Sequence, residues 1–130
     1  MKNNRKKVMI LTNHSYMLYR FRKELIEELM KNYDVVLSMP FVGHHEDFIN
    51  MGLRCIETKM ERRGVNPIHD FSLMKFYKKI LQEENSDLVI TYSIKPNVYG
   101  GLMCEKLNIP FYANVQGLGT AFQKPGLAQF

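Results

Sequence analysis

Five short apolar runs, separated by longer amphipathic segments, constrain the fold of this chain more than any other feature of its sequence. The first and fourth runs, Lys7–Thr12 and Asp87–Thr91, show almost no alternation of apolar and polar residues. This pattern is typical of strands buried on both faces, which occur in parallel sheets covered by helices on both sides. The five predicted strands are Lys7–Thr12, Val35–Met39, Leu53–Glu57, Asp87–Thr91 and Ile109–Asn114.

The segments between these runs carry apolar residues at helical spacing. Ser15 is a good N-cap for the first helix, and Asp70 or Ser72 could cap the third. The alternating order of strands and helices predicts one α/β domain, a Rossmann-like doubly wound sheet of about five parallel strands with helices on both faces. The predicted helices are one that follows Ser15 and runs to about Asn32, Glu46–Met51, about Ile68 to Glu84, and Pro96–Leu107.

The composition is that of an ordinary globular domain. The chain has 130 residues, of which 45% are hydrophobic and 24% charged, enough for one domain with a real core. No apolar run approaches the ~20 residues that span a bilayer, and no signal-peptide pattern is present, so we expect a cytoplasmic protein. Cys55 and Cys104 fall far apart in elements predicted to be buried, which favours reduced core thiols.

The amino terminus is basic. Four of the 18 Lys and Arg residues lie in the first seven positions, and the net charge is +5. A tail of this kind can meet an anionic membrane surface, with about 1 kcal/mol per charge. Nucleic acid is disfavoured because no recognition-helix, zinc-knuckle or RNP-like pattern is present. A solvated, frayed terminus is the alternative.

Polar residues follow four of the five predicted strands. Since the carboxyl ends of parallel strands meet at one edge of the sheet, where ligands bind in such folds, we expect these residues to surround one crevice. Lysine, arginine and exposed backbone N–H groups favour a phosphorylated ligand there. An ordinary strand–helix turn with a solvated lysine, and a solvated basic loop, are the alternatives. The candidate residues are Asn13, His14, Ser15, Arg62, Arg63, Tyr92, Lys95, Asn97, Gly117, Gly119 and Thr120.

Several familiar sites are disfavoured. The loop after the first strand lacks the glycines of a GxGxxG dinucleotide fingerprint, so no nicotinamide or flavin cofactor is expected there. Adjacent histidines point in different directions, so no metal is expected at His44 and His45. The pair Gly100–Gly101 inside a helix costs about 1 kcal/mol per glycine, which is tolerable if the helix packs very close to the sheet or to a ligand.

Three motifs carry a resemblance that extends over nearly the whole chain. They are Arg62–Pro67, Asp87–Gly101 and Gly117–Phe122, with a weaker match at Tyr19–Lys23. In order and spacing they resemble the amino-terminal domain of bacterial family 4 glycosyltransferases, of the type that builds capsule, exopolysaccharide and O-antigen.

The resemblance implies the two-domain GT-B fold, in which the amino-terminal domain mainly binds the acceptor. The carboxyl-terminal domain of that fold binds the nucleotide-sugar donor. It implies a retaining transferase without obligatory metal or cofactor, acting on polyprenyl-diphosphate-linked saccharides at the inner face of the cytoplasmic membrane. Residues 1–130 would form the acceptor domain only, without the donor domain and its paired glutamates. We therefore expect the chain alone to be inactive and to need a donor-binding domain in cis or on a separate chain.

The resemblance also implies roles for the candidate residues. Asn13 to Tyr16 would line the cleft, and Arg62 and Arg63 would approach acceptor phosphate. Lys95 and Asn97 would hold the acceptor or the transferred sugar. The Gly117–Gly119 backbone would border the cleft. Where many family members have glycines in the first loop, this chain has His14–Ser15, which puts a donor-phosphate role for that loop in doubt. No catalytic base is identified, and His14 is a candidate by position only.

Two other functions remain open. One is a stand-alone α/β module that binds a phosphate ligand or regulates a partner; a flavodoxin-like version would purify yellow. A receiver-like version fits poorly, because Asn13, His14, Lys59 and Met60 stand where acidic residues would be needed. The other is half of a sugar-phosphate epimerase with the same fold, which the lack of a clear acid/base pair disfavours.

Overall fold

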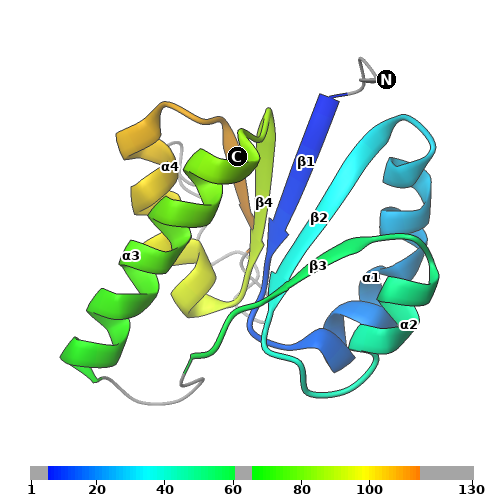
Figure 1. Ribbon diagram of the computed structural model, residues 1–130, viewed down its shortest axis with the longest axis horizontal. Helices are drawn as coiled ribbons and strands as arrows, with labels where there is room; N and C mark the ends of the chain where they lie inside the picture. Colours follow the sequence, from blue (N-terminus) through cyan, green and yellow to red (C-terminus); the bar gives the residue numbers. More distant parts are fainter. Residues whose placement is uncertain (1–5, 61–65, 115–130) are drawn as a thin grey trace.

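A computed structural model describes residues 6–60 and 66–114 of the chain. Its centre is a parallel five-stranded sheet with the strand order β3-β2-β1-β4-β5 (Figure 1). The observed strands differ from the predicted ones by at most two residues at either end. They are β1 (Lys6–Leu11), β2 (Tyr33–Met39), β3 (Arg54–Glu57), β4 (Leu88–Tyr92) and β5 (Phe111–Asn114). The predicted doubly wound α/β fold is thereby confirmed.

The predicted helices are all present, with two corrections to their ends. The first helix stops at Met30, because residues 31–32 turn directly into β2. Asn66 caps the third helix, accepting a hydrogen bond from the backbone N–H of His69. Asp70 and Ser72, the predicted caps, lie inside that helix. The observed helices are α1 (Ser15–Met30), α2 (His45–Asn50), α3 (Pro67–Glu84), the π-helical turn η1 (Pro96–Gly100) and α4 (Gly101–Leu107).

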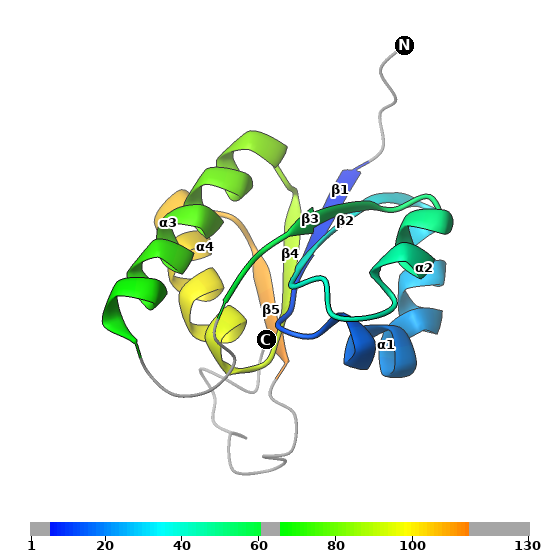
Figure 2. The ribbon, with the colours of Figure 1, turned by 60° about the horizontal axis from the view of Figure 1, so that its bottom comes forward.

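Two helical layers cover the two faces of the sheet. Figure 1 shows α1 and α2 on one side and α3 and α4 on the other, and Figure 2 shows the same separation after rotation. Alternate residues of β1 divide between the layers: Val8 and Ile10 join the core under α1 and α2, whereas Met9 and Leu11 join the core under α3 and α4. This division explains why the Val8–Leu11 part of β1 is apolar throughout, since each of these residues meets a buried layer.

The Gly100–Gly101 pair explains the close approach of the last helix to the sheet. A Cβ atom at Gly100 would lie 2.6 Å from Leu11 Cδ1, and one at Gly101 would lie 2.9 Å from Phe111 Cε2. Both distances are shorter than real Cβ contacts allow. Of the two alternatives that the sequence left open, close packing against the sheet or against a ligand, the structure shows packing against the sheet.

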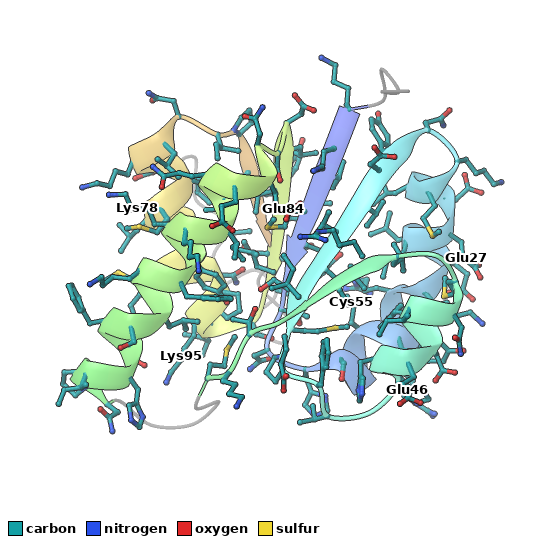
Figure 3. All side chains as sticks on the ribbon, viewed as in Figure 1. Glu27, Glu46, Cys55, Lys78, Glu84 and Lys95 are labelled. Carbon is teal, nitrogen blue, oxygen red and sulfur yellow. The ribbon has the colours of Figure 1, made fainter. Side chains whose placement is uncertain are left out.

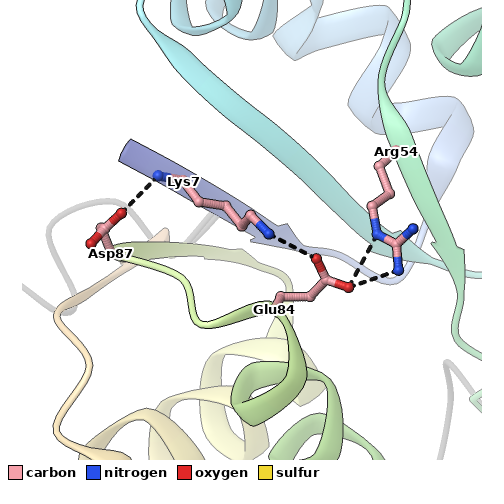
Figure 4. Close-up of polar contacts among 4 residues, drawn as sticks. All are labelled: Lys7, Arg54, Glu84 and Asp87. Carbon is pink, nitrogen blue, oxygen red and sulfur yellow. Dashed lines mark hydrogen bonds and ion pairs between the residues drawn. The ribbon is translucent and has the colours of Figure 1, made fainter. Parts of the chain in front are cut away.

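A charged network ties the amino-terminal edge of the sheet together (Figure 4). One oxygen of the Glu84 carboxylate lies 3.2 Å from Lys7 Nζ, and the other lies 2.8 Å from a terminal nitrogen of Arg54. Asp87 accepts a 2.8 Å hydrogen bond from the backbone N–H of Lys7. Glu84 thus joins the end of α3 to β1 and β3, on the side of the sheet opposite to the expected crevice.

Candidate functional site at the carboxyl edge of the sheet

The carboxyl edge of the sheet has a topological switch point between β1 and β4. From β1 the chain moves outward through β2 to β3, then returns across to β4 on the other side of β1. The loops that follow β1 and β4 therefore leave in different directions, and in open α/β sheets such a switch point is where ligands bind. Asn13 and His14 follow β1, and Ser93 to Asn97 follow β4, so the strand order brings these predicted site residues to one edge.

The loop after β1 is anchored by Ser15. Its side chain is fully buried, donates a hydrogen bond to the backbone carbonyl of Gly43 and accepts one from the N–H of Val42 at 3.2 Å. Ser15 therefore fastens the first loop to the loop between β2 and α2, and its hydroxyl is occupied by these contacts. Asn13 and His14 are half-buried beside it.

Lys95 has a partner that sequence reasoning missed. Its Nζ lies 2.9 Å from Oδ1 of Asp70 in α3, and both side chains are buried. Tyr99 donates a 3.0 Å hydrogen bond to the other carboxylate oxygen. The hydrogen bond from Lys95 holds the pKa of Asp70 below its usual value, against the opposing effect of burial. Figure 3 shows Lys95 beside the amino-terminal part of α3.

This pairing bears on the predicted phosphate role of Lys95. An incoming anion would have to share an ammonium group that Asp70 already neutralises. Phosphate binding by Lys95 therefore stays a prediction. It requires that Asp70 neutralise only part of the positive charge of Lys95. The sequence offered one weak signal for the pair, an aspartate in the first turn of a helix with a lysine on a different element.

Asn97 links three elements of the edge. Thr91 of β4 donates a 2.6 Å hydrogen bond to the side-chain oxygen of Asn97, whose amide nitrogen donates to the backbone carbonyl of Asn114 in β5 at 2.8 Å. Both ends of this amide are therefore committed inside the protein. Asn97 holds η1 against β4 and β5, so its amide is committed to internal hydrogen bonds at this edge of the sheet.

Tyr92 ends β4 with a buried ring. Only 4% of the residue is exposed, and the guanidinium of Arg22 from α1 lies 5.3 Å from its ring centroid. Burial raises the pKa of the Tyr92 phenol, and the nearby Arg22 partly offsets this. Arg22 lies in the weakly matching Tyr19–Lys23 segment, and its place over a strand end could be assigned only from the structure.

A cavity of about 610 Å³ opens where β3 ends and α3 begins. Its polar residues include Glu57, Lys59 and His69, and Leu73 and Phe76 form part of its apolar wall. Sequence reasoning did not find it, because its walls come from two elements with no motif in common. The candidate residues Arg62, Arg63, Gly117, Gly119 and Thr120 lie outside the described residues.

Within residues 6–60 and 66–114, no three His, Cys, Asp or Glu side chains gather closely enough to hold a metal ion. The helices in these same ranges are too short or too polar to cross a bilayer. His44 stacks on Tyr19 with ring centroids 4.3 Å apart, whereas His45 stacks on Phe41 at 4.5 Å.

Solved structures share this arrangement of strands and helices. A glycosyltransferase from Rickettsia africae superposes with a TM-score of 0.68 and 16% identity, covering 98% of this chain and 35% of that one. MurG from Acinetobacter baumannii superposes with a TM-score of 0.67 and 14% identity, and the match covers 83% of this chain and 33% of MurG. A UDP-N-acetylglucosamine 2-epimerase from Listeria monocytogenes superposes with a TM-score of 0.64 and 11% identity, and the match covers 95% of this chain and 34% of the epimerase. The fold is one half of a GT-B fold.

A curated relative supports the same architecture at the level of sequence. The chain is 25% identical over 122 residues to the N,N'-diacetylbacillosaminyl-diphospho-undecaprenol alpha-1,3-N-acetylgalactosaminyltransferase of Campylobacter jejuni. The match covers 92% of this chain and 32% of the relative. The chain thus spans about one third of the length of the relative it matches. No protein-family profile matches the chain.

Proposed function

We propose that this chain is the acceptor-binding half of a retaining glycosyltransferase. In this proposal a sugar moves from a nucleotide-sugar to a polyprenyl-diphosphate-linked saccharide during surface polysaccharide synthesis. The observation that carries it is the 122-residue match to a transferase whose name specifies a diphospho-undecaprenol-linked acceptor. The GT-B half-fold agrees with it, because such halves are arranged in pairs around a catalytic cleft.

The finer parts of the proposal follow from the family resemblance. The chain belongs with family 4 enzymes of capsule or exopolysaccharide type, acts at the inner face of the cytoplasmic membrane as a peripheral protein, and needs neither metal nor cofactor. The donor-binding domain lies in cis or on a separate chain, and without it the chain binds acceptor but transfers nothing. The nucleotide-sugar is a substrate of the whole enzyme.

Within this proposal, the predicted site residues have different tasks. Asn13 and His14 are half-buried at the carboxyl edge and are placed to meet the acceptor. Ser15 and Asn97 keep the crevice in shape through their internal hydrogen bonds. Lys95 supplies to the crevice only the part of its positive charge that its ion pair with Asp70 does not neutralise.

Nuclear magnetic resonance of the chain with a short-chain prenyl-diphosphate-linked N-acetylhexosamine tests the proposal. We expect amide shifts to change in the loops after β1 and β4, at Asn13, His14 and Ser93, and not at the opposite edge near Glu84. A nucleotide-sugar without acceptor should leave these signals in place. Binding of the nucleotide-sugar at these loops, with no response to the acceptor, would contradict the proposal and favour an epimerase half-domain. A response to inorganic phosphate alone would favour the stand-alone phosphate-binding module.

A further inference from the structure

The outer face of α3 and α4 carries a basic groove with apolar residues at one end. The groove has a volume of about 400 Å³. Phe71, Lys75, Lys78 and Lys79 follow one another at helical spacing along α3, and Lys106 of α4 completes the opposite wall. We call these five residues the α3–α4 surface. All five are at least partly exposed, so this stripe is separate from the core-facing stripe of the same helix.

The lysines of this surface lack acidic partners in the part of the chain that the structure describes. Lys75 lies 5.6 Å above the ring centroid of Phe71, and none of the four lysines makes an ion pair within that part. Helix α3 has three carboxylates. Glu83 is exposed one helical turn beyond Lys79 and makes no ion pair with it, and the other two are engaged elsewhere. Asp70 points inward to Lys95, and Glu84 pairs with residues of β1 and β3. The groove therefore carries four positive charges and no carboxylate among its lining residues.

Two large apolar side chains lie at the amino-terminal end of this stripe. Ile68 is 76% exposed and Phe71 is 58% exposed. Exposing such side chains next to one another is costly unless a partner covers them. Lysines with apolar stems beside exposed aliphatic and aromatic residues are the composition that binds at a lipid headgroup boundary.

We infer that the α3–α4 surface docks the protein on an anionic lipid bilayer. The charges suit negatively charged headgroups, and Ile68 and Phe71 can enter the boundary between headgroups and acyl chains. Charge also favours one side of the molecule: Figure 3 shows Lys78 on the outer side of α3, with Glu27 and Glu46 on the opposite side of the molecule. Docking through α3 therefore turns these acidic residues away from the bilayer.

The position of the apolar end links docking to the candidate site. Helix α3 begins just beyond the end of β3, so Ile68 and Phe71 lie at the carboxyl edge of the sheet. Docking brings this edge close to the headgroups, where the diphosphate of a lipid-linked acceptor would lie. This last step rests on the proposed function, whereas the docking itself rests only on the surface.

Sedimentation with vesicles tests docking without any acceptor. We expect the chain to bind vesicles of phosphatidylcholine and phosphatidylglycerol and to bind phosphatidylcholine alone far more weakly. The variant K75Q/K79Q should lose on the order of 30-fold in vesicle partition, from about 1 kcal/mol for each lysine. The matched control K23Q/K31Q removes the same charge from α1 and the turn that follows it, and should stay within about threefold of the parent chain.

A second variant separates the apolar contribution from charge. I68S/F71S should lower partition on the order of tenfold, and the loss should persist at high salt, where the lysine contribution is screened. Equal loss in K75Q/K79Q and K23Q/K31Q would overturn the inference, because binding would then follow net charge alone. Binding to soluble polyglutamate without binding to vesicles would also overturn it and favour an acidic protein partner. Failure of acceptor binding, with vesicle binding intact, would refute the proposed function and leave docking standing.

Discussion

Lys95 Nζ lies 2.9 Å from Asp70 Oδ1, and this buried pair joins the start of α3 to the helix that follows β4. The two residues are 25 positions apart in the sequence. A buried ion pair of this kind need not add net stability, but removing one partner leaves the other charge buried without compensation.

Breaking the Asp70–Lys95 pair from one side should destabilise the protein more than replacing both residues. We expect D70A and K95A each to lower the melting temperature by several degrees, and D70L/K95M to lower it less than the sum of the two. Thermal unfolding followed by circular dichroism measures all three, with K79A on the exposed face of α3 as the control. Additive effects in the double variant would contradict the coupling, since independent sites add.

The Glu84 network should make stability depend on pH in the acid range. Burial opposes the ionisation of Glu84, but hydrogen bonds from Arg54 and Lys7 outweigh it and hold its pKa below the ordinary value of 4.5. Because the folded-state pKa is lower than the unfolded one, the stabilisation is fully present above pH 4.5 and is lost as the pH falls toward the folded value. Urea unfolding at a series of pH values should show a shallower acid slope in E84Q than in the parent chain. An unchanged slope would mean that other carboxylates dominate.

Adding a methyl group at Gly100 should destabilise the protein, although alanine is the better helix former. The new Cβ would meet Leu11, which is completely buried. Overpacking of this kind costs about 1–3 kcal/mol, which exceeds the gain of about 1 kcal/mol in helix propensity. Urea denaturation of G100A measures the net effect. Shortening the neighbour in G100A/L11V should recover part of the loss, and no recovery would mean that the cost arises elsewhere.

Removing the Ser15 hydroxyl should weaken the anchor between two loops. S15A leaves the N–H of Val42 and the carbonyl of Gly43 without this partner, so we expect a loss of about 1 kcal/mol in the free energy of unfolding. H14A changes the adjacent half-buried residue without touching this anchor and should cost less. If S15A were as stable as the parent chain while acceptor binding disappeared, the hydroxyl would be a ligand contact and not an anchor.

The two cysteines should react slowly in the folded protein. Burial raises the pKa of the Cys55 thiol to about 11 and that of Cys104 to about 12. Since the thiolate is the reactive form, alkylation of Cys55 near neutral pH should be on the order of 100-fold slower than in denaturant, and that of Cys104 slower still. Mass spectrometry after timed alkylation measures both. Rapid labelling of Cys104 in the folded state would contradict its burial in the core beneath α3 and α4.

The sequence by itself determined the order of strands and helices, and therefore the fold. Apolar runs such as Val8–Leu11 and the helical stripe of α3 are local patterns, and their periodicities are set by backbone geometry within a few residues. The pair Gly100–Gly101 also indicated a close neighbour for the last helix, and the structure identified that neighbour as the sheet and not a ligand.

Only the tertiary structure decided what the candidate site residues contact. Asp70 was predicted as a helix cap and proved to be the partner of Lys95, while Asn66 took the capping position. Ser15 bonds to a loop 28 residues away, and Asn97 bonds to the end of β5. These pairings depend on strand order and on which face each helix covers. Such long-range relations bring together side chains whose local sequences carry no sign of one another.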